Sequence, residues 1–373
     1  MNPIKYAFFI FLLLTAFSCK SSRTAIFGAQ PVLKIKPGPD NPRNSEGDFI
    51  TLKDGRILFI YSRYYGNSSS DHATAKLASR ESKDGGKTWS TEDKTVVEKE
   101  GIMNVMSVSL LRLQSGQIAL FYLRKNSGSD CIPMMRISTD EAQTWSEPVA
   151  CITDKKGYFV LNNDRVIQLK NGRLLMAVAL HQTPEESKWH DNATLYSYYS
   201  DDNGKTWTAG AAVPNPEQVV FQEPGVIELT NGDIMMIIRA GAGVQYKSYS
   251  KDKGQTWSPG TATGIKSPLS PATVQRIPST GDLLIAWNNN GGEDPAMKGK
   301  RTPLTLAVSK DDGNTWQYIR NIETDPDGWY CYTAMHFAGK NILLGYCAGS
   351  QSKKTHLSVV VVKRFSVSDI YKQ

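Results

Sequence analysis

One octapeptide recurs five times along this chain, and no other feature constrains the fold as strongly. Its pattern is Ser-x-Asp-x-Gly-x-x-Trp, with Ala142 in place of Gly in the second copy, and successive copies start 56, 62, 50 and 59 residues apart. In such a turn the Asp accepts backbone N–H bonds, the Gly takes a positive φ, and the Trp folds back under a hairpin. The recurrence predicts repeated units of similar length. The copies are SKDGGKTW (82–89), STDEAQTW (138–145), SDDNGKTW (200–207), SKDKGQTW (250–257) and SKDDGNTW (309–316).

A second pattern interleaves with the octapeptides. Six segments each contain two strand-like runs around a turn, which predicts a β-hairpin. Six units in this chain have about 59 residues each, the size of a four-stranded blade, and no segment has sustained helical periodicity. We therefore expect an all-β fold, a six-bladed β-propeller, in which residues 32–38 pair with the last blade through a strand in 357–367. The predicted hairpins are 46–63, 107–124, 163–180, 223–240, 271–288 and 332–349.

The N-terminal residues have the pattern of an export signal. Lys5 precedes an apolar run, 6–17, that is too short to span a bilayer as a helix. Ala16 and Ser18 then precede Cys19, which resembles a bacterial lipoprotein signal with cleavage before a lipidated cysteine. An ordinary secretory signal is the alternative, and both predict export. We expect a signal peptide at 1–18, a linker at 19–30 after lipidated Cys19, and a propeller at 31–373, on the periplasmic or the external face of the cell.

Composition excludes several classes of protein. Hydrophobic residues at 40% and charged residues at 21% exclude a disordered chain and a multi-span membrane protein. The net charge is +7, but no Lys or Arg run is long enough for a nucleic-acid-binding patch. The His residues are scattered without metal-ligand spacing, so we expect no metal and no other cofactor. Four cysteines beyond Cys19 allow either two disulfides or buried free thiols, and they are Cys131, Cys151, Cys331 and Cys347.

Polar and charged residues gather where the first strand of each predicted hairpin begins. The first strands of the blades line the central channel of a propeller, so their starts converge on one face although they are far apart in sequence. Charges of both signs at one mouth cost desolvation free energy, which favours a functional pocket over a merely structural channel. These residues are Arg43 and Glu46, Asn104 and Ser107, Asn163, Asp164 and Arg165, Gln222 and Glu223, Ser270, and Tyr330 and Tyr332.

The five octapeptides, the six hairpins and the polar strand starts together resemble the sialidase (neuraminidase) superfamily of β-propellers, whose octapeptide repeat is called the Asp box. The resemblance covers nearly all of the chain after residue 30. It implies three arginines that bind the substrate carboxylate, because a planar carboxylate accepts bidentate guanidinium bonds. Arg239 and Arg301 match the second and third of these arginines. Arg43 in NPRNSEGDF is the candidate for the first, but the Ile-Pro of the family motif is absent and Arg43 lies about two residues further out.

The resemblance also implies catalytic residues. Tyr332 matches the nucleophilic tyrosine, with Tyr330 as a rival, and Glu223 in a Glu-Pro segment matches the glutamate that acts as its base. Asp71 matches the aspartate that protonates the leaving group, with neighbouring His72 as an alternative acid. Such an enzyme would release a terminal 2-keto-3-deoxy acid sugar with retention through a tyrosyl intermediate.

Other polar residues leave the substrate open. Arg63 matches a further pocket arginine. Glu46, Asp164 and Arg165 match no catalytic role of the family, so they are either structural pairs or the mark of a different acidic sugar. The alternatives to a sialidase are a propeller glycosidase or lyase for another acidic sugar, and a non-catalytic glycan-binding lipoprotein. In each case we expect a monomer whose partner is a glycan and whose contact with a membrane is a lipid anchor only.

Overall fold

The computed structural model describes residues 30–372, so the predicted signal peptide at 1–18, Cys19 and all but the last residue of the 19–30 linker lie outside the described residues. Within that range the fold is all-β, and its one helix, α1 (Val367–Ile370), has four residues. No helix in this range therefore has the length and apolar character needed to cross a membrane.

The strands form one nine-stranded sheet and four sheets of four strands each. The four-stranded sheets consist of β2 (Asn44–Thr51), β3 (Ile57–Tyr64), β4 (Ala75–Ser82) and β5 (Lys94–Val97); of β15 (Phe221–Glu228), β16 (Ile234–Ala240), β17 (Val244–Ser250) and β18 (Thr261–Lys266); of β19 (Thr273–Arg276), β20 (Leu283–Asn288), β21 (Leu304–Ser309) and β22 (Gln317–Glu323); and of β23 (Gly328–Ala338), β24 (Asn341–Ser350), β25 (Val360–Ser366) and β1 (Leu33–Ile35). The nine-stranded sheet contains β6 (Asn104–Arg112), β7 (Ile118–Ser127), β8 (Asp130–Ser138), β9 (Val149–Ala150), β10 (Tyr158–Val160), β11 (Val166–Gln168), β12 (Leu174–Gln182), β13 (Thr194–Ser200) and β14 (Thr208–Ala209).

All six predicted hairpins are confirmed as antiparallel pairs. They are β2–β3, β6–β7, β11–β12, β15–β16, β19–β20 and β23–β24. The nine-stranded sheet contains two of them, because β10 joins β8 through one parallel pair, Tyr158 with Cys131. The predicted pairing of residues 32–38 with a strand in 357–367 is also confirmed, since Leu33 of β1 pairs with Val362 of β25.

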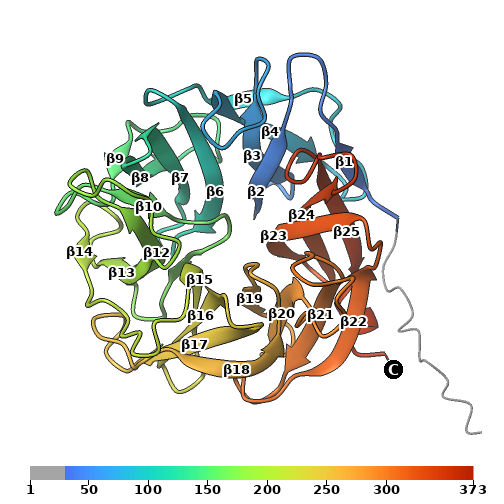
Figure 1. The fold of residues 1–373 in the computed structure, drawn as a ribbon. Coiled ribbons are helices and arrows are strands. Elements are labelled where there is room, and N and C mark those ends of the chain that lie inside the picture. The colour runs from blue at the N-terminus through green and yellow to red at the C-terminus, as the bar shows by residue number, and fades with distance from the viewer. Residues whose placement is uncertain (1–29, 373) are drawn as a thin grey trace, which may run out of the picture.

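The first strands of the hairpins lie around a common centre, which the surrounding sheets enclose in Figure 1. Contacts run from β2 to β6, from β6 to β11, from β11 to β15, from β15 to β19, from β19 to β23, and from β23 back to β2. Residues at the starts of these strands are therefore neighbours in space although they come from the whole length of the chain.

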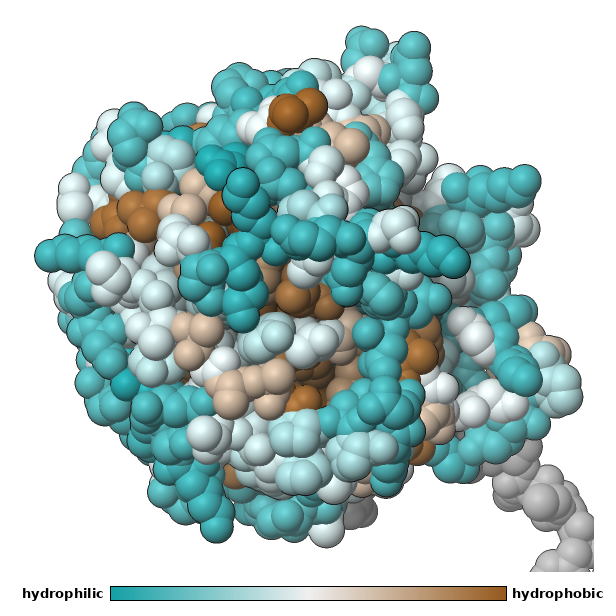
Figure 2. All heavy atoms as spheres, turned by 60° about the vertical axis from the view of Figure 1, so that its left-hand side comes forward, coloured by the Kyte–Doolittle hydropathy of each residue, from teal (hydrophilic) through white to brown (hydrophobic). Residues whose placement is uncertain are grey.

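The hydrophobic core lies between neighbouring sheets rather than in one central mass. One cluster packs Ile60 of β3 against Leu120 of β7, and another packs Phe59 of β3 against Leu343 of β24. The cysteines at 131, 151, 331 and 347 are buried free thiols, which decides between the two predicted cysteine states. In the view of Figure 2 the surface is mostly hydrophilic, and the hydrophobic residues appear mainly in recesses between hydrophilic ones.

Each octapeptide is a turn held by its own Ser and Asp side chains. In the third copy Asp202 accepts the backbone N–H of Thr206 at 2.9 Å and its hydroxyl at 2.6 Å, while Ser200 accepts the N–H of Gly204 at 2.8 Å. Gly204 has φ 86°, and a Cβ there would lie 2.4 Å from Met135. Trp207 donates to the Gly204 carbonyl at 3.1 Å, so the indole folds back under the turn.

We predict that Asp202→Ala lowers the free energy of unfolding by about 1–2 kcal/mol at pH 7, because the turn loses hydrogen bonds to an ionised acceptor. Burial opposes ionisation of Asp202, but its bonds from Thr206 and Ser200 outweigh burial and lower its pKa to about 2. A lowered carboxyl pKa stabilises the fold above the unfolded pKa of about 3.9, and that stabilisation is lost as the pH falls toward 2. Urea unfolding should therefore show a difference in free energy of unfolding between wild type and variant that becomes smaller below about pH 4. The exposed Asp40, replaced by Ala, is the control, and a difference that becomes larger on acidification contradicts the prediction.

Candidate active site

A cavity of about 370 Å³ lies where the first strands of several hairpins begin. Its lining combines charged and polar side chains with apolar and aromatic ones, a mixture typical of small-molecule sites. The polar lining consists of Glu46, Asp71, Ser107, Asn162, His181, Gln222, Glu223, Arg239, Arg301, Tyr332 and His356. The apolar and aromatic lining consists of Met106, Leu123, Tyr158, Val160, Trp189, Trp329 and Leu357.

Residues with positive φ aim several of these side chains. Glu46, Ser107, Glu223 and Tyr332 have φ of 52°, 59°, 40° and 54°, and each lies where the strand pairing shifts register. Asp164, just before β11, has φ 56°. Such bulges re-aim side chains, and each left-handed residue other than Gly costs on the order of 1–3 kcal/mol, so they persist only where surrounding contacts hold them.

Tyr332 and Glu223 form the centre of a charged group in the cavity lining. The Tyr332 hydroxyl donates to Glu223 Oε1 at 2.9 Å, and Arg239 forms an ion pair with the other carboxylate oxygen. The Arg301 guanidinium lies 5.6 Å from the centre of the Tyr332 ring and 4.9 Å from that of Trp329. A phenol hydrogen-bonded to a carboxylate between two cations is an arrangement that can transfer a proton from oxygen to oxygen.

The charges in this group set the protonation states. Burial opposes ionisation of Glu223, but Arg239 and Arg301 outweigh burial and lower the pKa of its carboxyl. Burial, followed by the charge of Glu223, raises the pKa of the Tyr332 phenol well above its ordinary value. Glu223 is therefore an ionised acceptor and Tyr332 a protonated donor. Arg239 Nε is buried and has no hydrogen-bond partner within residues 30–372.

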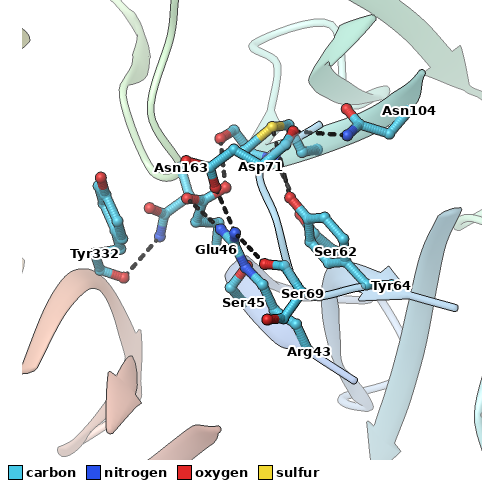
Figure 3. A network of polar contacts seen from close by, with 12 residues as sticks. Arg43, Ser45, Glu46, Ser62, Tyr64, Ser69, Asp71, Asn104, Asn163 and Tyr332 are labelled. Atoms are coloured by element: carbon cyan, nitrogen blue, oxygen red, sulfur yellow. Dashed lines mark hydrogen bonds and ion pairs between the residues drawn. The ribbon is translucent and has the colours of Figure 1, made fainter. Parts of the chain in front are cut away.

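Arg43 organises the neighbouring part of the cavity (Figure 3). Its guanidinium forms ion pairs with Asp71 and, at 3.5 Å, with Glu46, and its Nε donates to Ser45 Oγ at 3.0 Å. Glu46 also accepts the Ser107 hydroxyl at 2.8 Å. Desolvation by the surrounding protein opposes ionisation of Asp71, although its side chain is 56% exposed, but the charge of Arg43 outweighs desolvation and lowers the pKa of the carboxyl.

A buried polar layer supports the cavity. Asn163 donates to the carbonyl of Tyr332 at 3.0 Å and to that of Gly47 at 2.9 Å, so it joins β2 to β23, and Figure 3 shows it beside Tyr332. Asp164 accepts from the Met335 N–H at 2.9 Å, and burial raises the pKa of its carboxyl to about 7. Arg165 donates to the Ala272 carbonyl at 2.8 Å. These contacts fix strand starts to one another.

His181 and Trp189 form an aromatic wall of the cavity. Their rings stack 4.2 Å apart, and Tyr158 meets the Trp189 ring edge-on at 5.0 Å. His181 Nδ1 lies 2.8 Å from the carbonyl of His190, so this nitrogen carries the proton. Among residues 30–372 no group of His, Cys, Asp and Glu side chains is arranged to hold a metal ion.

A comparison with protein families finds a match that covers most of the described chain. A family model described as a BNR repeat-like domain matches residues 91–344. The chain belongs to this family, within the sialidase superfamily.

Relatives of this chain include a sialidase of Paraclostridium sordellii, which is 29% identical over 209 residues. The match covers 50% of this chain and 50% of that protein. The chain thus matches about half the length of this relative. A solved protein of unknown function from Dyadobacter fermentans has a TM-score of 0.70 at 19% identity, over 91% of this chain and 99% of that one. A leech intramolecular trans-sialidase has a TM-score of 0.71 at 16% identity, over 92% and 71%. At these identities the structures establish a shared fold.

Most of the residues predicted from the BNR resemblance lie together. Tyr332, Glu223, Asp71, Arg239 and Arg301 line one cavity. Glu46 lines it as well, and Arg43 reaches it through its ion pairs with Glu46 and Asp71.

Four predicted residues lie elsewhere. The described cavity lining does not include Asp164 and Arg165, which lie in the buried layer between strand starts. Arg63 forms an ion pair with Asp93 at 2.8 Å, because its position on β3 directs it away from the centre. Tyr330 packs against Tyr346 in a hydrophobic cluster, because it precedes the bulge that re-aims Tyr332.

Sequence reasoning missed the aromatic wall and one buried lysine. Trp189 lies in the loop between β12 and β13, and no repeat predicts the path of that loop. Lys125 lies late in β7 and is fully buried, with its ammonium 2.8 Å from the Asp71 carbonyl. A lysine that ends an apolar strand run was the available signal, but it is equally typical of an exposed strand end.

We predict that Arg239→Met destabilises this BNR fold by about 3–5 kcal/mol, because it leaves the carboxylate of Glu223, which is 11% exposed, without its ion-pair partner. The double variant Arg239→Met with Glu223→Gln should recover at least about 1 kcal/mol of that loss. The measurement is urea unfolding of the wild type, both single variants and the double variant. A double variant less stable than Arg239→Met would contradict the assigned ion pair.

Proposed function

We propose that this protein is an exo-glycosidase of the sialidase type, which hydrolyses a terminal sialic-acid-like 2-keto-3-deoxy acid sugar from glycans. The observation that carries the proposal is the Tyr332–Glu223 hydrogen bond beside Arg239 and Arg301 in one cavity. Relatives named sialidase from two clostridial species support it, at 29% and 28% identity.

In the first step the Tyr332 oxygen attacks the anomeric carbon while its proton passes to Glu223. The bond from that carbon to the leaving oxygen breaks, and Asp71 supplies the proton that the leaving alcohol needs. Asp71 must therefore enter this step protonated, although Arg43 lowers the pKa of its carboxyl in the free protein. A neutral phenol suits this substrate, because the carboxylate on the anomeric carbon repels an anionic nucleophile. The products of the step are the free alcohol and a tyrosyl glycoside.

In the second step water attacks the same carbon from the face that the alcohol left. Asp71 accepts a proton from the water, and Glu223 returns a proton to the departing Tyr332 oxygen. Two displacements at one carbon give overall retention of configuration. Each catalytic group ends in the protonation state in which it began.

The substrate carboxylate fits the arginine side of the cavity. Arg239 and Arg301 both line the cavity, and Arg301 lies over the ring of the proposed nucleophile. Arg43 is already engaged, because Ser45, Asp71 and Glu46 occupy its guanidinium. We therefore assign most of the carboxylate binding to Arg239 and Arg301, with Arg43 as the group that holds Asp71 and Glu46.

We also propose the number of blades in the fold. We assign six blades by dividing the nine-stranded sheet at β10, which would give one blade for each predicted hairpin. The cyclic contacts among the first strands support this division. The octapeptide turns would then be the Asp boxes of the superfamily.

A glycosidase or lyase for another acidic sugar is the second candidate, and the engagement of Arg43 favours it. A glycan-binding lipoprotein without activity is the third. A panel of aryl glycosides separates the first two candidates, because an aryl sialoside is cleaved under the first alone. Binding on a glycan array without turnover of any ligand would support the third.

We predict that Tyr332→Phe lowers turnover of an aryl sialoside by several orders of magnitude and leaves thermal stability nearly unchanged, because it removes the nucleophilic oxygen and keeps the ring. Tyr330→Phe is the matched control, since this tyrosine lies in a hydrophobic cluster two positions away, and it should keep near wild-type kinetics. Full activity of Tyr332→Phe would remove the tyrosyl mechanism.

We also propose that the protein is exported, lipidated at Cys19 and anchored to a membrane on the periplasmic or external face. The N-terminal sequence supports this proposal through its apolar run and the Ser18–Cys19 junction. Mass spectrometry of the membrane fraction should find an N-terminal peptide that begins at lipidated Cys19, and Cys19→Ser should move the protein to the soluble fraction. A wild-type protein that is soluble and free of lipid contradicts the anchor.

A further inference from the structure

Asp71 lies on a loop that has little internal support. The loop joins β3 to β4, and the Asp71 side chain is 56% exposed. The backbone bonds that belong to the loop itself include those from Ala73 to Ser70 and from Tyr65 to Thr74, each 3.0 Å. Residues 66–74 of this loop include no large apolar side chain, so the position of Asp71 depends on contacts from outside the loop.

Two side chains from the next hairpin supply such contacts. The Lys125 ammonium donates to the Asp71 carbonyl at 2.8 Å. The Asn104 amide donates to the same carbonyl at 2.9 Å and to the Ala73 carbonyl at 2.7 Å. Asn104 begins β6 and Lys125 lies late in β7, where the two residues are register partners. The three bonds hold the backbone on either side of the Asp71 carboxyl, and Figure 3 shows Asn104 directed at this segment.

Both donors are fully buried, which is unusual for a lysine. Burying an ammonium costs several kcal/mol unless it is paired, and this one has a carbonyl acceptor and the face of Tyr158, 5.0 Å away. The charged groups around it are Asp71, Glu46 and Arg43. A methionine would fill a similar volume without the desolvation free energy of an ammonium. The charge at this position therefore indicates a role beyond packing.

We propose that Lys125 and Asn104 are positioning residues for Asp71, which hold its backbone so that the carboxyl faces Tyr332 across the cavity. The inference deepens the proposed function, because it assigns how the proton donor to the leaving group is kept in place. Neither residue touches the substrate, since both act through the loop.

This role has a kinetic signature that general destabilisation lacks. An alkyl leaving group needs a proton as the glycosidic bond breaks, whereas an aryl leaving group departs as a stabilised phenolate and needs little assistance. Lys125→Met should therefore lower kcat/KM for an alkyl-linked sialoside by roughly 10- to 100-fold and that for an aryl sialoside by less than about 3-fold. Asn104→Ala should show the same selectivity. Lys125→Arg, which keeps the charge, should restore part of the alkyl activity.

Hydrogen exchange of the full chain tests the positioning without reference to catalysis. Lys125→Met and Asn104→Ala should speed exchange at the amides of Ala73 and Tyr65, relative to the wild type and to a control, Lys76→Met. Lys76 pairs with Glu98 at 3.9 Å outside the cavity lining.

The outcomes separate the two proposals. A wild type that cleaves no sialoside refutes the proposed function, and exchange at the loop then decides whether Lys125 and Asn104 hold it. Unchanged loop exchange in both variants overturns the positioning role whatever the activity. Equal loss on alkyl and aryl substrates overturns it as well, because the defect would not be in protonation of the leaving group.

Discussion

The site depends on a backbone conformation that most residues avoid. At Glu46, Ser107, Glu223 and Tyr332 the chain takes a positive φ where the strand pairing shifts. A regular strand would send alternate side chains into the layers between sheets, and the bulge turns one of them toward the centre. The strain is balanced by packing between sheets, as where Phe59 and Leu343 meet. The packed hydrophobic layers between the sheets therefore allow the strained backbone at the strand starts to persist.

Charge pairing in the cavity follows from that placement. Side chains brought to a common centre lose water, and an unpaired charge there is costly. The structure balances Glu223 with Arg239, and it balances Arg43 with Glu46 and Asp71. Removing one partner should therefore cost more than the pair contributes, because the remaining charge stays buried.

The sequence predicted the parts of the fold that repeat. All six hairpins follow from local patterns of turn residues and alternation, which the structure keeps. The pairing of the N-terminal strand with β25 was predicted from the closure of a ring of repeated units. It also predicted which strand starts hold the polar residues, because a shared centre follows from repetition. Five of the residues predicted from the resemblance, including Tyr332 and Glu223, line the same cavity.

The sequence could not predict features that depend on a register shift within one strand or on the path of an irregular loop. Tyr330 and Tyr332 are two positions apart and would share a face in a regular strand, but the bulge between Cys331 and Ala334 separates them. Arg63 lies on the second strand of its hairpin and pairs with Asp93 instead of entering the cavity. Lys125 shows the same limit, since its burial depends on a loop from another hairpin that covers it.

Arg43 links the charge pairing in the cavity to the position of Asp71. Its guanidinium lies among Ser45, Glu46 and Asp71, and these contacts use donors that a carboxylate ligand would need. If the arriving carboxylate displaced Asp71 from Arg43, the aspartate would lose the cation that lowers its pKa and would gain a proton more readily. Lys125 and Asn104 bind the backbone of Asp71 and not its carboxyl, so they would hold the loop during such an exchange. Asp71, the proposed acid, would therefore lose Arg43 as its charge partner while its backbone stays in position.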